Sequence, residues 1–148
     1  MPSFALRPLP APLPPLQPGS TTIVVDEANA YPCRRCLRDA EPGERVVLLS
    51  YDPFDAPADS PYRQPGPIFV HAHPCSREAS GRLPDQLTRR MLSVRAFDDR
   101  HVMLGGVVVQ GEELERTVER LLEDGAVAYL HVHNAGPGCF ATRIDRAA

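Results

Sequence analysis

The sequence lacks lysine: all sixteen basic residues of the 148-residue chain are arginine. Because no side chain carries a primary amine, a Schiff-base mechanism or another form of lysine catalysis is excluded. No apolar run approaches the roughly 18 residues of a membrane-spanning helix, and no basic region at the start is followed by an apolar stretch and a small-residue cleavage site. We therefore expect a cytoplasmic protein with no membrane partner.

The signatures of several large enzyme classes are also missing. The chain has no glycine-rich dinucleotide fingerprint, no phosphate-binding loop, no nucleophile elbow and no His-Glu-x-x-His zinc motif. Its net charge of −3 argues against a bulk electrostatic affinity for nucleic acid. The sequence therefore predicts no nucleic-acid partner, names no other partner, and leaves open whether the protein is an enzyme.

Length and composition are those of one ordinary globular domain. A chain of this size buries roughly 70% of the surface that its unfolded form exposes, so no metal or disulfide is needed merely to fold it. Seven prolines fall within the first 18 residues, which excludes helix there and favours an extended segment near polyproline II. We predict an extended proline-rich arm over residues 1–19 and a single domain over residues 20–148.

The pattern of apolar residues predicts an α+β domain. Leu114, Val118, Leu121 and Leu122 have helical spacing and predict an amphipathic helix at about 112–124 that packs on a sheet. A shorter helix is expected near Leu83, Leu87 and Met91, which recur at four-residue steps. Runs of β-branched and aromatic residues predict strands at 21–25, 45–51, 67–73, 93–97, 101–109, 126–133 and 138–144. The expected architecture is a mostly antiparallel, mixed sheet of five to seven strands, with a strand–helix–strand crossover between 101 and 133.

Eight of the nine cysteines and histidines fall in three short clusters. The clusters are Cys33 and Cys36; His71, His73 and Cys75; and His131, His133 and Cys139. Alternation along a strand places the two histidines of each His-x-His pair on one face and the aliphatic residues on the other. If both strands were neighbours with their aliphatic faces under the 112–124 helix, up to four imidazoles would converge on the opposite face.

The first two clusters suggest a metal site. Two thiols three residues apart in a turn can hold one zinc ion, and two further ligands complete a tetrahedron. The nearest candidates for those two ligands are His71, His73 and Cys75. Zinc is thus the one cofactor that the sequence suggests, and the site would be structural with four protein ligands and catalytic with a water in one position.

Two other interpretations fit the same residues. Arg34 and Arg35 stand between Cys33 and Cys36 and would favour the thiolate form, as in a Cys-x-x-Cys redox protein. Alternatively, the cysteines are merely buried. In that case the chain is a ligand-binding or interaction module without metal, whose N-terminal arm and proline-rich 52–66 loop frame a pocket or a partner surface.

Several ordered motifs also carry a resemblance. They are Pro32-Cys33-Arg34-x-Cys36-Leu37, Gly66-Pro-Ile-Phe-Val-His71 with Cys75 shortly after, Val94-Arg-Ala-Phe-Asp98, and His131-Val-x-Asn134 with Gly138-Cys139-Phe140 and Arg143. From about residue 20 to the end the chain resembles the bacterial domain-of-unknown-function family 1203. The resemblance implies a compact bacterial domain and no particular reaction. Its matched positions add a possible ligand site or second cluster, composed of Arg34, His131, Asn134, Cys139 and Arg143.

Overall fold

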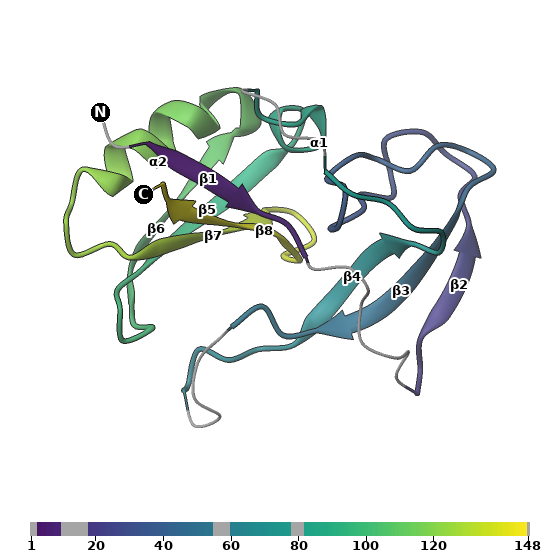
Figure 1. Cartoon of the computed structure of the whole chain (residues 1–148), viewed down its shortest axis with the longest axis horizontal. Helices are drawn as coiled ribbons and strands as arrows, with labels where there is room; N and C mark the ends of the chain where they lie inside the picture. The colour runs from purple at the N-terminus through teal and green to yellow at the C-terminus, as the bar shows by residue number, and fades with distance from the viewer. Residues whose placement is uncertain (1–2, 10–17, 55–59, 78–81, 148) are drawn as a thin grey trace.

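A computed structural model describes residues 3–9, 18–54, 60–77 and 82–147 of the chain (Figure 1). Its strands form two sheets in which all pairings are antiparallel, and two short α-helices accompany them, so the α+β class is confirmed. The larger sheet has the order β1 (Phe4–Arg7), β8 (Phe140–Arg146), β7 (Tyr129–Asn134), β5 (Met91–Phe97), β6 (Met103–Gln110). The smaller sheet has the order β2 (Thr21–Val24), β3 (Arg45–Tyr51), β4 (Gly66–His71).

The predicted crossover lies in the five-stranded sheet. Strand β5 pairs antiparallel with β6 on one side and with β7 on the other, so β6 and β7 run parallel to each other. A short 3-10 turn, Gly111–Glu113, and helix α2 (Leu114–Leu122) connect them. The strand–helix–strand unit expected between 101 and 133 is therefore present, with β5 inserted between its two strands.

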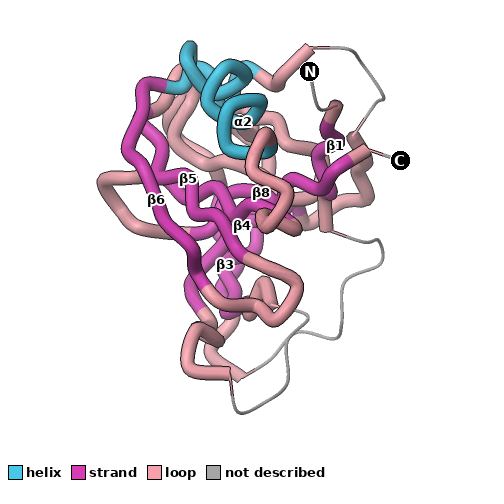
Figure 2. The backbone as a smooth tube through the Cα atoms, turned by 90° about the vertical axis from the view of Figure 1, so that its left-hand side faces the viewer, coloured by secondary structure: helices cyan, strands magenta, loops and turns pink. Residues whose placement is uncertain are grey.

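Helix α2 covers one face of the five-stranded sheet, as both views indicate (Figures 1 and 2). Leu114, Val118 and Leu122 are fully buried in one cluster with Leu130 and Val132 of β7. Burial of each such side chain contributes roughly 1.5–3 kcal/mol. The periodicity of the apolar residues therefore identified the buried face of α2 correctly. No helix in the described part of the chain is long and apolar enough to cross a membrane.

The shorter helix, α1, spans Asp85–Thr88 and follows Pro84, which stands at its N-cap position in an extended conformation. Proline suits a helix start because its missing N–H would have no intrahelical partner there. Leu87 joins the core under α2. The four-residue spacing also suggested Met91 as part of this helix, but Met91 instead begins β5 and is half exposed.

The three-stranded sheet has a core of its own. Ile68 and Val70 of β4 pack with Val47 against the thiols Cys33 and Cys36. The expectation that this aliphatic face packs under the 112–124 helix is therefore wrong. The expected convergence of four imidazoles is wrong as well, because β4 and β7 belong to different sheets. Periodicity assigns side chains to faces of a strand, but it carries no information on which strands are neighbours.

The N-terminal segment lies along the edge of the larger sheet. Residues Phe4–Arg7 form β1, which pairs with β8, and the backbone of Ala147 donates to Ser3, so the two ends of the described chain lie side by side. An edge position suits this segment because proline follows it, and proline has no N–H to donate to a neighbouring strand. Leu9 is buried against the cysteine-containing cluster of the smaller sheet, and residues 10–17 of the expected arm lie outside the described part.

Candidate metal centre

Residues 32–39, which we call the cysteine loop, fold back on themselves. Pro32 and Asp39 form an isolated antiparallel bridge, and the N–H of Leu37 donates to the carbonyl of Cys33 at 3.1 Å. Leu37 has a φ of 60°, in the left-handed region that lets the backbone reverse direction tightly. The reversal presents Cys33 and Cys36 on the same side of the loop.

The loop is fastened to the smaller sheet and to helix α1. Cys33 forms a parallel bridge with Phe69 of β4, which fixes the loop on the smaller sheet. From α1, the side-chain amide of Gln86 donates to the carbonyls of Cys33 and Arg38, each at 3.0 Å. Each of these carbonyls also accepts a backbone N–H, that of Cys33 from Leu37 and that of Arg38 from Cys33, so the amide of Gln86 adds a second hydrogen bond to each.

Four potential ligands meet where the cysteine loop faces the end of β4. The sulfur atoms of Cys33, Cys36 and Cys75 and a ring nitrogen of His71 all lie within 4.8 Å of one another. Cys33 Sγ is 3.7 Å from Cys75 Sγ, and Cys36 Sγ is 3.5 Å from His71 Nδ1. Tetrahedral zinc, with Zn–S near 2.3 Å and Zn–N near 2.0–2.1 Å, requires separations of about 3.8 Å and about 3.6 Å for such pairs. The cluster is therefore close enough to hold a metal ion.

A carboxylate orients the imidazole of this cluster. Nε2 of His71 lies 3.1 Å from Glu44 Oε1, so the tautomer that donates from Nε2 leaves the Nδ1 lone pair directed at the sulfurs. Metal-bound histidines commonly have such a carboxylate behind them. The same Glu44 oxygen accepts the N–H of Glu41, and this bond together with the one to His71 holds the pKa of Glu44 below its usual range.

The surroundings of Cys33 favour anionic sulfur. The thiol of Cys36 donates to Cys33 Sγ, and so do backbone N–H groups, including that of His71 at 3.3 Å. These hydrogen bonds lower the pKa of the Cys33 thiol. The hydrogen bond shared with Cys33, together with burial, raises the pKa of the Cys36 thiol. The guanidinium of Arg35 donates to Cys75 Sγ at 3.2 Å and to the carbonyls of His71 and His73. Three thiolates around a divalent zinc leave a net charge of −1, which this buried arginine offsets.

The two arginines between the thiols do not act as the redox interpretation expects. Neither guanidinium is hydrogen-bonded to Cys33 or Cys36: Arg35 contacts Cys75, and Arg34 contacts Cys139. The two guanidiniums instead contact sulfurs that lie 105 and 40 residues away in the chain. Cys33 and Cys36 are also 0% and 2% exposed.

His73, the remaining candidate ligand of the second cluster, lies outside the group of four. Its side chain is half exposed, its ring packs 4.5 Å from that of His71, and its Nε2 is 3.7 Å from Glu44 Oε2. His71 and His73 do point together, as alternation predicts. Because β4 ends at His71, the chain turns away after it, and His73 faces Glu44 rather than the thiols.

The possible second cluster separates into two groups. Arg34, Asn134 and Cys139 come together: Cys139 Sγ lies 3.0 Å from Arg34 Nη2 and 3.5 Å from Asn134 Nδ2. His131 and Arg143 instead belong to the face of the larger sheet opposite α2, where the Arg143 guanidinium lies 4.0 Å above a ring of β7.

His131 is enclosed by aromatic rings. Its ring centroid is 4.6 Å from that of Phe54 and 5.1 Å from that of Phe97, and it is fully buried. Neither ring nitrogen has a hydrogen-bond partner among the described residues. Burial, and then the positive charges of His133, Arg143 and Arg95, lower the pKa of His131 to about 3.

The described parts of the proline-rich 52–66 loop line a cavity of about 510 Å³ on the same side of the larger sheet. Arg95 and His133 supply its polar wall, and rings including Phe54 and Tyr62 supply its apolar wall. The pocket that the ligand-binding hypothesis expects thus has a physical counterpart, framed by this loop.

Sequence reasoning missed two residues and one contact of the candidate metal centre. Glu44 reaches His71 because the antiparallel pairing of β3 with β4 sets Val46 opposite His71. Gln86 and the Arg35–Cys75 contact likewise depend on how distant segments meet. No local spacing signals such contacts, since each depends on register or on docking between elements.

Comparison with known proteins identifies one family. The family model described as protein of unknown function, DUF1203, matches residues 30–146, which include every residue of the cluster. Neither a search of curated proteins nor a search of solved structures finds a match.

Proposed function

This chain belongs to the DUF1203 family of proteins of unknown function, and we propose that it is a zinc-binding domain whose ion is held by Cys33, Cys36, His71 and Cys75. The ion would join the cysteine loop to the end of β4 and to the segment that follows. Of the two ligands left open by the sequence, the geometry favours His71 and Cys75 over His73.

The proposal rests on the spacing of the donor atoms. The 3.7 Å between Cys33 Sγ and Cys75 Sγ is close to a tetrahedral edge around zinc and far longer than the roughly 2.05 Å of a disulfide. These cysteines are 42 residues apart in the chain, so the spacing is not a by-product of a local turn. The four donors also have the soft sulfur and imidazole chemistry that zinc prefers.

The proposed site is structural. Four protein ligands fill the tetrahedron, so no position remains for the water that catalytic zinc requires. Cys36 and His71 also line a cavity of about 460 Å³, which supplies an access route for the ion from solvent. The surrounding donors, Glu44 and Arg35, orient the ligands and balance the charge.

Elemental analysis of the native protein tests the proposal. We expect about one equivalent of zinc per chain, and its loss in the Cys33→Ala, Cys36→Ala double variant. Cys139→Ser is the matched control, since it removes a thiol outside the cluster and should leave the zinc content unchanged. Native protein that is purified without chelators and takes up no zinc on addition would overturn the proposal.

The same sample distinguishes the redox alternative. Bound zinc protects its thiolates, so we expect slow alkylation of Cys33 at neutral pH that accelerates on addition of a strong chelator. Fast alkylation without chelator, with a reversible Cys33–Cys36 disulfide, would support a thiol redox protein instead.

A further inference from the structure

Cys139 is a thiol outside the proposed zinc cluster, immediately before β8. It is partly exposed and lines both the 510 Å³ cavity and a second cavity of about 380 Å³. Its sulfur contacts Arg34 and Asn134, and no other cysteine lies against it in the described chain, which includes all four cysteines. Neither the family description nor the zinc proposal assigns it a role.

Arg34 gives the first reason to regard this sulfur as anionic. The side chain is only 2% exposed, and its guanidinium donates to the carbonyls of Phe140 at 2.7 Å and Pro32 at 2.6 Å and to Cys139 Sγ at 3.0 Å. Both carbonyls are neutral, and no carboxylate pairs with Arg34 among the described residues. A guanidinium stays charged in proteins, and a buried charge is costly unless it is paired. Among these partners of Arg34, only Cys139 Sγ can carry a negative charge, and it lies at hydrogen-bond distance.

Asn134 gives an independent reason to expect a ligand. The residue is 5% exposed and lines the 380 Å³ cavity together with Cys139. Its Nδ2 donates to the sulfur at 3.5 Å, while its Oδ1 is buried with no hydrogen-bond partner in the described residues. An amide oxygen that is buried without a hydrogen-bond partner destabilises the fold, and a donor group on a bound molecule would supply the missing partner. The rest of this wall is largely apolar, with Phe69, Met91 and Pro137.

We propose that Cys139 is a nucleophilic thiolate that is oxidised by small hydroperoxides. The O–H of the hydroperoxide donates to Asn134 Oδ1, and any alkyl group lies against the apolar wall. The sulfur attacks the hydroxyl oxygen, so that an S–O bond forms as the O–O bond breaks. Sulfur is oxidised by two electrons, and the departing alkoxide, or hydroxide from hydrogen peroxide, takes a proton from solvent.

The product is a sulfenic acid at Cys139. Because no second thiol lies beside it, the sulfenic acid does not condense to an internal disulfide in this fold and persists until a small thiol reduces it. Arg34 and Asn134 donate to the modified sulfur group as they do to the thiolate. The zinc ligands stay reduced under the same mild conditions.

The first test is alkylation of the zinc-loaded wild-type protein with iodoacetamide, with peptide mass spectrometry of Cys139. At pH 7 we expect Cys139 to be labelled faster than the same residue in the urea-unfolded protein, because the guanidinium of Arg34 donates to its sulfur in the fold. Labelling no faster than in the unfolded protein, or no labelling at all, would overturn the proposal.

The second test is oxidation by a stoichiometric amount of hydrogen peroxide or cumene hydroperoxide, followed by dimedone trapping. We expect one dimedone adduct, on Cys139, absent in Cys139→Ser and formed at least about tenfold more slowly in Asn134→Leu. Adducts that appear first on other cysteines would contradict the assignment. Zinc content is measured on the same samples, so that failure of this proposal can be distinguished from failure of the zinc proposal.

Discussion

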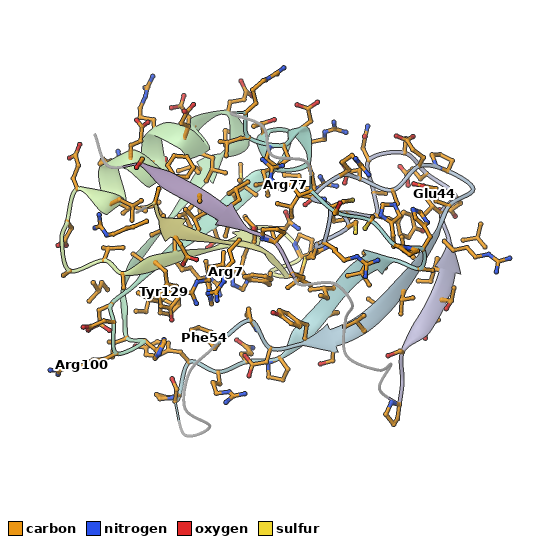
Figure 3. The ribbon with its side chains drawn as sticks, in the orientation of Figure 1. Arg7, Glu44, Phe54, Arg77, Arg100 and Tyr129 are labelled. Atoms are coloured by element: carbon orange, nitrogen blue, oxygen red, sulfur yellow. The ribbon has the colours of Figure 1, made fainter. Side chains whose placement is uncertain are left out.

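The two His-x-His pairs have the same spacing and alternate in the same way, yet the fold uses them differently. His71 is bonded to a thiol at 3.5 Å and a carboxylate at 3.1 Å. His131 packs against aromatic rings and has no hydrogen-bond partner in the described chain. Figure 3 labels Glu44, beside the first pair, and Tyr129, beside the second, near opposite ends of the molecule.

The difference follows from where each pair lies in its strand. His71 is the last residue of β4, where the cysteine loop and the turn that carries Glu44 come within reach. His131 lies in the middle of β7, with Arg95 of β5 opposite it on one side and Arg143 of β8 on the other. A histidine at a strand end meets polar loops and becomes a ligand candidate. A histidine in mid-sheet beside two arginines is kept neutral.

Removal of the imidazole of His71 is expected to have a larger effect than removal of the imidazole of His131. His71→Ala should abolish zinc binding and destabilise the fold by about 3 kcal/mol or more, because three thiols, two of them buried, then lose their shared partner. For a chain of this size that corresponds to a fall in melting temperature of about 10 °C. Elemental analysis and thermal denaturation measure both effects.

His73→Ala is the matched control for that variant. It removes the neighbouring imidazole, which is half exposed and outside the group of four, so zinc content should not change. If His73→Ala lost zinc and His71→Ala kept it, the ligand assignment between the two histidines would be reversed.

His131→Phe should change acid stability and leave zinc binding unchanged. The folded-state pKa of His131, about 3, lies below the unfolded value near 6.5, so the unfolded chain binds more protons between these limits. The stability of the wild type is therefore complete above pH 6.5 and decreases as the pH falls towards 3.

Relative to the wild type, His131→Phe should lose roughly 3 kcal/mol less stability between pH 6.5 and 4. Urea denaturation at several pH values measures the stability of both proteins. The zinc cluster is the same in both, so its acid sensitivity cancels in the difference between them. Parallel stability curves for the two proteins would mean that His131 is hydrated or paired, and the contrast between the two histidine pairs would weaken.

Glu44→Gln should lower zinc affinity by about 10- to 100-fold without removing a ligand, because it weakens the acceptor behind His71. Competition with a chromophoric chelator measures the affinity. Glu41→Gln serves as control, since Glu41 contributes its backbone N–H to Glu44 and no side-chain contact to the imidazole. Equal affinities in all three proteins would exclude a role for the Glu44 carboxylate.

Tyr129→Phe should give the smallest effect, a loss of about 1 kcal/mol. The hydroxyl of Tyr129 lies 2.8 Å from His101 Nδ1, while its ring keeps its contacts with Phe97 and Arg143 in the variant. Chemical denaturation measures the loss, and zinc content should stay at the wild-type value. A loss of zinc here would show that the two regions are coupled.

Local patterns sufficed for much of the fold. The spacing of Leu114, Val118 and Leu122 predicted α2 and its buried face, and the β-branched runs predicted most of the strands. The division into two sheets could not be predicted, since strand order depends on which segments dock after they form. The four-imidazole hypothesis was wrong for that reason.

The candidate metal centre was predicted to a similar extent. The chemistry of thiols and imidazoles identified Cys33, Cys36, His71 and Cys75, and the structure brings their donor atoms within 4.8 Å. The spacing could not decide between His71 and His73. It also gave no hint of Glu44 or Gln86, whose contacts arise from strand register and from the docking of α1.

The amide of Gln86 has a consequence for folding. It holds the carbonyls of Cys33 and Arg38 from a helix whose Leu87 lies in the core of the other sheet. The cysteine loop therefore reaches its final shape only after that helix has docked. We expect tight capture of the ion to be a late event, so that metal uptake during refolding reports on assembly of both halves of the molecule.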